Sequence, residues 1–155
     1  MSSIARPWRL TSLWNISALV LIMAYVAWRL LRAAEYHELA ARLGYDGPSR
    51  TFPIAYFRQL APAGTLPQEV WARMASYHGV DYFVAPIVGT TDSIVIQRFT
   101  YPMTWDELNV DIEYSGAVVR DIEVTGYLGP GVRRLTADEA YVRLGWRPIT
   151  ASSGQ

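Results

Sequence analysis

Acidic side chains at alternate positions are the part of this sequence with the clearest chemical potential. Between residues 108 and 124, apolar and acidic residues alternate, as in strands that are buried on one face only. The carboxylates that this pattern gathers on the outward face are Asp111, Glu113, Asp121 and Glu123. Arg98 on the preceding strand, or solvent, is the simplest neutralising partner. A basic protein surface is the next alternative, and calcium is weaker because no Asp-x-Asp-x-Asp-Gly loop occurs.

Residues suited to catalysis are sparse. The chain has no Cys and two histidines, His37 and His78, which lie far apart in the sequence. Ser76 precedes His78 by two positions on a predicted helix, so their side chains should point apart. Phosphate-binding loops and G-x-S-x-G motifs are absent from the sequence. A chain of 155 residues also leaves little volume for the deep cleft of a glycosidase. We therefore expect no enzymatic activity, no metal and no cofactor.

Charge composition argues against a nucleic-acid partner. The 14 basic residues, all Arg, are balanced by 14 acidic residues, and the formal net charge is zero. The arginines are also interleaved with the acids along the chain rather than clustered. Binding to a phosphate backbone depends on concentrated positive charge, which this sequence lacks.

A β-hairpin must position the four carboxylates. A loop of three residues, 115–117, pairs Tyr114 with Val118 and Val110 with Ile122, so that apolar residues share one face. A two-residue loop at 115–116 would place carboxylates on the apolar face. The longer loop sets Asp111 opposite Asp121, a repulsive pairing, and directs Arg120 toward the apolar side.

The rest of the domain is predicted from capping motifs and strand patterns. Thr65 to Gln68 forms a predicted capping box that opens a helix to about His78, and Thr136 to Glu139 forms a second box for a short helix ending at Gly145. Strands are expected at 82–88 and 94–101. The fold class is therefore α+β, with an antiparallel meander of three to four strands packed with a capped helix and a short C-terminal helix.

An uncharged stretch of 19 residues lies between Arg9 and Arg29. At 1.5 Å per residue it spans about 28 Å, close to the thickness of the bilayer core. Trp and Tyr residues occur near both ends, as is typical of the membrane interface. A soluble core helix, a cleaved signal peptide and an interfacial helix fit less well. Within the span, Asn15 and Ser17 are expected to contact another transmembrane helix.

The predicted domain organisation follows from this span. Residues 1–44 form a transmembrane anchor that continues as a helical stalk, 45–64 a connector, 65–147 the small α+β domain and 148–155 a polar tail. Arg6 and Arg9 on a short N-terminus favour a cytoplasmic N-terminus and an extracytoplasmic domain, although Arg29 and Arg32 on the other flank nearly balance them.

The order of a capped helix followed by a strand meander and a hairpin resembles the SmpA/OmlA and beta-lactamase-inhibitor-like superfamily. The resemblance covers roughly residues 60–126, and the matching positions are Gly64, Thr65, Gln68, Glu69, Val70, Tyr101, Val110, Ile112, Tyr114, Gly116, Val118 and Ile122. It implies an envelope protein that binds other proteins through its sheet and has no catalytic residues. This chain departs from the lipoprotein members because it has no lipobox Cys.

Two functional hypotheses follow from these features. The first is a non-catalytic, single-pass membrane protein whose domain binds a partner protein, as an accessory subunit of a membrane complex. In this hypothesis the carboxylates Asp111, Glu113, Asp121 and Glu123 contact the partner. The alternative is a membrane-tethered sensor or small-ligand-binding module that uses the concave face of the sheet and its tyrosines.

Overall fold

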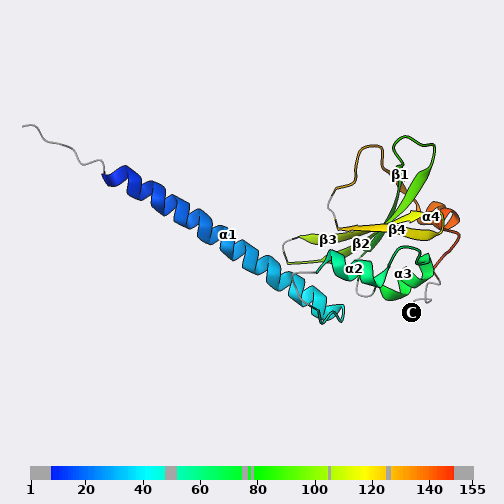
Figure 1. Cartoon of the computed structure of the whole chain (residues 1–155), viewed down its shortest axis with the longest axis horizontal. Helices are drawn as coiled ribbons and strands as arrows, with labels where there is room; N and C mark the ends of the chain where they lie inside the picture. Colours follow the sequence, from blue (N-terminus) through cyan, green and yellow to red (C-terminus); the bar gives the residue numbers. More distant parts are fainter. Residues whose placement is uncertain are drawn as a thin grey trace, which may run out of the picture.

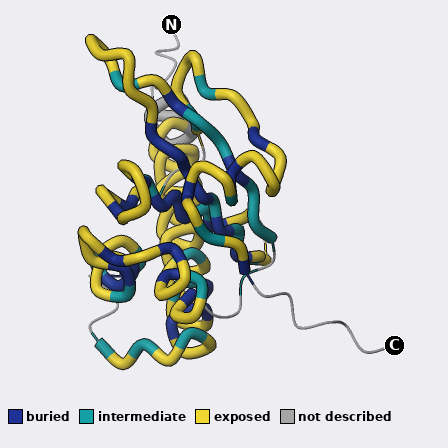
Figure 2. Tube along the Cα trace, turned by 90° about the vertical axis from the view of Figure 1, so that its right-hand side faces the viewer, coloured by how far each residue is buried: buried dark blue, intermediate teal, exposed yellow. Residues whose placement is uncertain are grey.

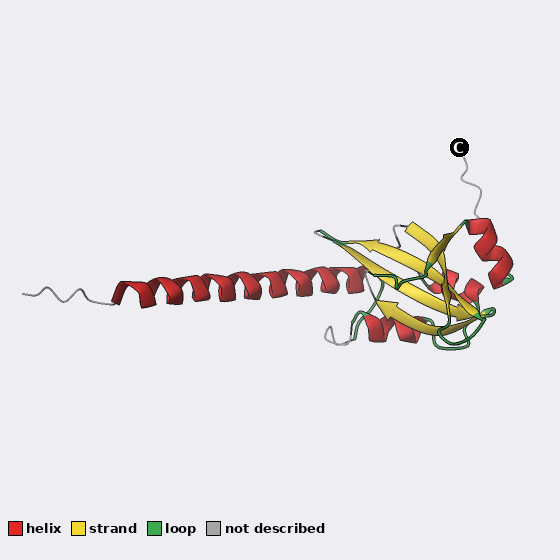
Figure 3. Ribbon diagram, turned by 90° about the horizontal axis from the view of Figure 1, so that it is seen from above, coloured by secondary structure: helices red, strands yellow, loops and turns green. Residues whose placement is uncertain are grey.

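The computed structural model describes residues 8–47, 52–74, 77, 79–104, 106–124 and 127–148. It is an α+β structure, in which one long helix is followed by an antiparallel sheet with short helices (Figures 1 and 3). This confirms the predicted fold class. The elements in chain order are α1 (Trp8–Arg42), α2 (Ile54–Leu60), α3 (Pro67–Arg73), β1 (Gly79–Pro86), β2 (Ser93–Pro102), β3 (Glu107–Ser115), β4 (Val118–Val124), β5 (Arg133–Leu135) and α4 (Ala137–Leu144).

Helix α1 projects away from the sheet, and most of its length is exposed (Figures 1 and 2). Its 35 residues extend about 50 Å at 1.5 Å per residue. Large apolar side chains are exposed along its middle, namely Trp14, Ile16, Leu19, Val20, Leu21, Ile22, Met23, Tyr25, Val26, Trp28, Leu30 and Leu31. Within the described part of the chain, α1 is the one helix long and apolar enough to cross a membrane.

The C-terminal turns of α1 enter the core of the sheet domain. Leu39 and Ala40 are buried, and the Tyr56 hydroxyl on α2 donates a hydrogen bond of 2.9 Å to the Leu43 carbonyl. Aromatic rings then connect this end of the helix to the sheet, because Phe57 packs against Tyr56 at 5.3 Å and against Tyr101 on β2 at 5.6 Å between ring centroids. The core therefore includes side chains from the predicted stalk and connector.

The sheet has five strands in the order β4-β3-β2-β1-β5, all antiparallel. The predicted strands at 82–88, 94–101 and the hairpin correspond to β1 to β4. β5 was not expected, because its three residues include two arginines and show no alternation. It pairs with β1, where Leu135 is opposite Tyr82.

The hairpin register differs from the prediction. The loop contains two residues, 116–117, and Tyr114 is opposite Val119, whereas Ile112 is opposite Ile122. A β-bulge at Arg120 adds one residue to β4 between these pairs. The predicted three-residue loop and the pairing of Val110 with Ile122 are therefore wrong. Because of the bulge, the apolar residues of the two strands still share one face. Arg120 is exposed, not directed toward the apolar side as predicted.

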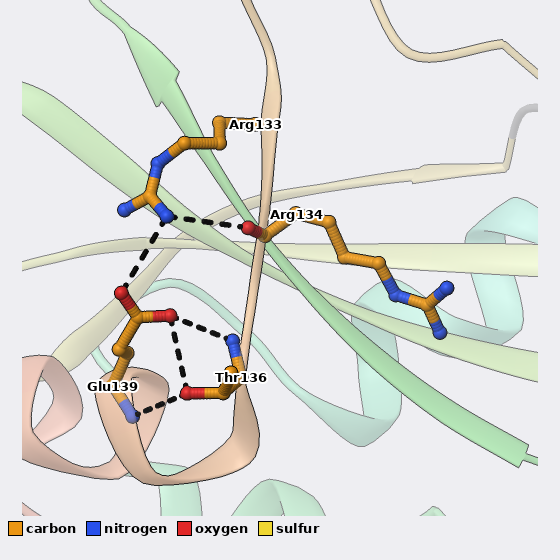
Figure 4. A network of polar contacts seen from close by, with 4 residues as sticks. All are labelled: Arg133, Arg134, Thr136 and Glu139. Carbon is orange, nitrogen blue, oxygen red and sulfur yellow. Dashed lines mark hydrogen bonds and ion pairs between the residues drawn. The ribbon is translucent and has the colours of Figure 1, made fainter.

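Of the two predicted capping boxes, the second is confirmed. The Thr136 hydroxyl accepts a hydrogen bond from the Glu139 amide at 3.3 Å, and the Glu139 carboxylate accepts one from the Thr136 amide at 2.8 Å (Figure 4). α4 then ends at Gly145, whose φ of 64° is in the left-handed region.

The first predicted capping box is wrong. Leu66 is the N-cap residue of α3, and the Thr65 hydroxyl donates instead to the Pro62 carbonyl at 2.6 Å. The reason is that the Thr65 carbonyl accepts a hydrogen bond from the Val119 amide, which holds this segment against β4. α3 also ends at Arg73, before the predicted end near His78, and His78 itself lies outside the described residues.

Phe57 should be a major contributor to stability, because it is fully buried between α1 and the sheet. We expect Phe57→Ala to lower the free energy of unfolding by about 3–5 kcal/mol, the usual cost of emptying a large aromatic site in a core. Chemical denaturation of the detergent-solubilised protein measures this. Val142→Ala is the control, because Val142 is 82% exposed and should change stability by less than about 0.5 kcal/mol. Equal effects of the two variants would contradict the inferred core.

Candidate functional site

The carboxylates Asp111, Glu113 and Glu123 lie on the face of the sheet opposite the main core. Apolar residues of β3 such as Val110 and Ile112 point into that core, so the acids between them point the other way. A smaller apolar cluster occupies the same face as the acids and consists of Ala85, Ile94 and Ile96 with Phe83, Ile87, Leu128 and Val132. The segment that follows β4 therefore covers part of this face.

Asp111 is not on a solvent-exposed surface, in contrast to the prediction. It is 3% exposed and accepts two hydrogen bonds from Arg98, from Nε to Oδ1 and from Nη2 to Oδ2, each 2.7 Å. Arg98 also lies over the Phe83 ring at 5.5 Å. Hydrogen bonding to Asp111 raises the pKa of Arg98, against the opposing effect of burial. The predicted neutralisation by Arg98 is thus confirmed, as a buried bidentate pair.

Asp121 also has an internal partner. Its Oδ1 accepts a hydrogen bond of 3.2 Å from Arg58 Nη2 on α2, and the same guanidinium lies 3.4 Å from the Ile122 carbonyl. Both side chains of the pair are about half exposed, so the ion pair itself contributes little to stability. Its effect is to connect α2 to β4. Asp121 is opposite Glu113 in the sheet, not opposite Asp111 as predicted.

Of the four predicted site carboxylates, Glu113 and Glu123 form no ion pair with the described residues. Glu113 is half-buried, and burial raises its pKa, with a further contribution from the negative charge of Glu123. Nearby Arg120, at the bulge, has the opposite effect. The charged form of Glu113 is therefore less stable than that of a glutamate in water. The structure brings the four predicted site residues together, but Asp111 and Asp121 form ion pairs within the domain.

Metal binding is not supported by the described residues, because none of their His, Asp and Glu side chains form a group of three or more that could hold an ion. His37 is exposed on α1.

Asn15 and Ser17 are exposed on the same helix. Because positions two apart do not share a helix face, one neighbouring helix could contact only one of these two residues.

Sequence reasoning missed an aromatic pocket at the end of the sheet near α4. The cavity has a volume of about 600 Å³ and is lined by side chains from α3, β1, β5, α4 and Tyr77. Trp71 and Tyr77 pack edge to face with centroids 5.5 Å apart, and Tyr82 and Tyr141 do the same at 5.6 Å. Their positions come from four separate segments, so no local pattern indicates the pocket. The abundance of tyrosine was the available signal.

Charged residues at the rim of this pocket are Asp81 on β1 and Arg134 on β5, which form an ion pair. Arg133 and Arg134 point to opposite sides of β5, so Arg133 contacts Glu139 at 3.5 Å while Arg134 is directed away from it (Figure 4). The pair is well exposed, because 40% of the Asp81 side chain and 70% of the Arg134 side chain are accessible.

A buried hydrogen-bond chain holds Tyr82, one of the residues that line the pocket. Gln97 Nε2 donates to the Tyr82 hydroxyl at 3.2 Å, and the Tyr114 hydroxyl donates to Gln97 Oε1 at 2.8 Å. Burial raises the pKa of Tyr82 and Tyr114, and a hydrogen bond to Tyr141 adds to the shift at Tyr82. These hydroxyls stay protonated at neutral pH.

Comparison with known proteins gives no assignment, since no family model, no curated protein and no solved structure matches the chain. The resemblance to the SmpA/OmlA and beta-lactamase-inhibitor-like superfamily therefore stays a prediction. Functional inference rests on the geometry of the carboxylate face and the aromatic pocket.

The buried pair and the exposed acid next to it should respond in opposite ways to neutralisation. Asp111→Asn leaves the Arg98 guanidinium without a counter-charge in a buried position, and we expect the free energy of unfolding to fall by about 3 kcal/mol. Glu123→Gln removes repulsion across the strand pair and should change stability by less than about 0.5 kcal/mol, in the stabilising direction. Urea denaturation of both variants compares them. A stabilising effect of Asp111→Asn would show that the Arg98 pair is not structural.

Proposed function

We propose that this protein is a non-catalytic, single-pass membrane protein whose α+β domain binds a partner protein as an accessory subunit of a membrane complex. The observation that carries the proposal is the exposed apolar surface of α1, which extends over residues 14–31. Apolar side chains on every side of a helix are typical of a segment surrounded by lipid, because in water all of this apolar surface would be exposed.

The sheet domain begins immediately beyond this apolar segment. Arg32 Nη2 lies 3.7 Å from Asp106 in the connection between β2 and β3, and Arg32 Nη1 lies 3.4 Å from Glu35. Tyr25 and Trp28, one to two turns earlier, are the aromatic residues expected at headgroup depth. The domain is then held close to the bilayer surface, where it can contact other subunits in the same membrane.

The proposed partner-binding surface is centred on Glu113 and Glu123. Asp111 is buried and paired with Arg98, and Asp121 is paired with Arg58, so neither is left for a partner. A basic side chain of the partner would relieve the unfavourable charge at Glu113. We place the domain on the extracytoplasmic side, because Arg6 and Arg9 precede the apolar segment.

A second candidate function is a membrane-tethered ligand-binding module. The aromatic pocket favours it, because a concave site of this volume with aromatic walls and few polar groups is typical of small-molecule binding. The carboxylate surface and the pocket lie on different elements, so the two functions can be tested separately.

Membrane insertion is tested with a charge in the middle of α1. We expect the wild-type chain to remain in the membrane pellet after extraction with alkaline carbonate. Leu21→Arg should move a large part of the chain to the soluble fraction, because an Arg at the centre of a span costs about 2.5–3.5 kcal/mol in insertion. Val142→Arg is the matched control on the exposed surface of the domain. Release of the wild-type chain by carbonate would contradict the anchor.

Orientation is measured on the same wild-type protein. An extracytoplasmic domain predicts that protease added to intact spheroplasts digests the C-terminal region. Protection in spheroplasts with digestion after lysis would reverse the assigned orientation while leaving the anchor in place.

Partner binding is tested by charge reversal on the carboxylate surface. Glu123→Lys should release the chain from its complex after mild detergent extraction, so that native mass analysis gives a species close to 17.5 kDa. Glu107→Lys is the control, because Glu107 is an exposed acid at the start of β3, the strand that pairs with β4. A monomeric wild-type chain, or equal effects of the two variants, would count against a partner at this surface.

A further inference from the structure

One side of α1 borders two neighbouring cavities where the helix passes the connection between β2 and β3. The first cavity has a volume of about 410 Å³ and is lined by Ala24, Ala27, Trp28, Leu31, Arg32 and Asp106. Ala24, Ala27 and Leu31 are three and four positions apart, so they lie along one side of the helix. The cavity therefore extends from the apolar segment of α1 to a cationic side chain at its end.

The second cavity lies about one turn further along the same side of α1. It has a volume of about 230 Å³, and its charged lining residues are Glu35, Glu38 and Arg42. Residues 102–104 at the end of β2 line it from the side of the sheet. The two cavities are adjacent, because Arg32 of the first contacts Glu35 of the second at 3.4 Å. Two carboxylates and one guanidinium give the second cavity an excess of one negative charge.

Glu35 is incompletely hydrogen-bonded at this position. Its side chain is 8% exposed, and its Oε1 is the one buried side-chain polar atom without a hydrogen-bond partner among the described residues. The other oxygen, Oε2, accepts a hydrogen bond from Arg32. A buried carboxylate oxygen without a donor is unfavourable, because burial removes its hydration and nothing replaces it. A ligand that brings an N–H donor to this cavity would remove the deficit.

Arg32 also has hydrogen-bonding capacity left. A guanidinium carries five N–H donors, and the hydrogen bond to Glu35 is the one that Arg32 donates to a described residue. Asp106, at 3.7 Å, is beyond hydrogen-bond distance, and its side chain is 64% exposed. Arginine can bind a phosphate through two parallel hydrogen bonds. Its position, about 4.5 Å along the helix from the end of the uncharged stretch at Arg29, corresponds to the headgroup region.

We propose that the two cavities together bind one phospholipid with a primary ammonium headgroup, of the phosphatidylethanolamine class. An acyl chain occupies the apolar cavity, the phosphate accepts hydrogen bonds from Arg32, and the ammonium donates a hydrogen bond to Oε1 of Glu35. This order along α1 is the order of the groups in the lipid. A quaternary ammonium has no N–H donor and leaves Oε1 without a partner. The inference rests on the membrane anchor of the proposed function.

Lipids that differ in the headgroup alone test this selectivity. The full chain is purified in maltoside micelles, freed of bound lipid and titrated with equimolar ethanolamine and choline phospholipids that have identical acyl chains. Native mass analysis separates the two complexes by mass. We expect the ethanolamine lipid to bind about tenfold more tightly, the usual effect of one hydrogen bond to a charged group. Equal binding of the two lipids would overturn the proposal.

Glu35→Gln tests the ammonium site. The preference for the ethanolamine lipid should fall to about twofold or less, because the hydrogen bond from the ammonium is no longer made to a charged oxygen. Glu107→Gln is the matched control, since Glu107 is an exposed acid that is not among the lining residues of either cavity, and it should keep the full preference. Thermal unfolding of both variants checks that the domain is intact. An unchanged preference in Glu35→Gln would contradict the role of Glu35.

Ala27→Leu tests the apolar cavity. The larger side chain fills part of the cavity and should weaken binding of both lipids several-fold without changing the preference between them. Ala18→Leu is the matched control, because Ala18 is nine positions away and therefore lies on the opposite side of α1. Equal effects of the two variants would contradict an acyl chain in this cavity.

A soluble headgroup compound separates a lipid from a free ligand. O-phosphoethanolamine has the phosphate and the ammonium without acyl chains, and at concentrations equal to those of the lipid it should not displace the ethanolamine lipid. Displacement would overturn the assignment to a lipid. A wild-type chain that stays in the membrane after carbonate extraction but binds both lipids equally refutes the lipid selectivity alone. Release by carbonate refutes the anchor and this proposal together.

Discussion

The packing of the last turns of α1 against the aromatic residues of α2 is the interaction on which the rest of the structure depends. Leu39 and Ala40 contribute to the same core as Phe57 and Tyr101, so the helix and the sheet share their buried side chains. The apolar surface of α1 and the surfaces of the sheet are thereby parts of one body. The binding surfaces of the sheet domain therefore keep their position relative to the apolar segment of α1.

Much of the fold could be predicted because local patterns encode it. Alternation between Leu108 and Val124 indicates the hairpin, and Thr136 with Glu139 indicates the start of α4. The register could not be predicted, since a bulge at Arg120 and a longer loop both satisfy the same alternation. The burial of Asp111 depends on Arg98, Phe83 and the segment after β4, which are distant in sequence.

The two candidate sites differ in how visible they were in the sequence. The carboxylates are close together along one hairpin, so alternation alone grouped them, and the structure changed only their individual roles. The aromatic pocket depends on the pairing of β5 with β1, because α4 with Tyr141 follows β5 directly and is thereby brought beside Tyr82. Because β5 consists of three residues without a strand pattern, the sequence does not predict the pocket.

The unbroken course of α1 has a mechanical consequence. One helix extends from the apolar segment to Arg42 and then enters the core, so the described part of the chain contains no hinge between them. A helix whose apolar length exceeds the local bilayer thickness tilts to match it. The sheet domain would tilt with the helix as a rigid lever, and the height and direction of the aromatic pocket above the membrane would follow the thickness of the bilayer.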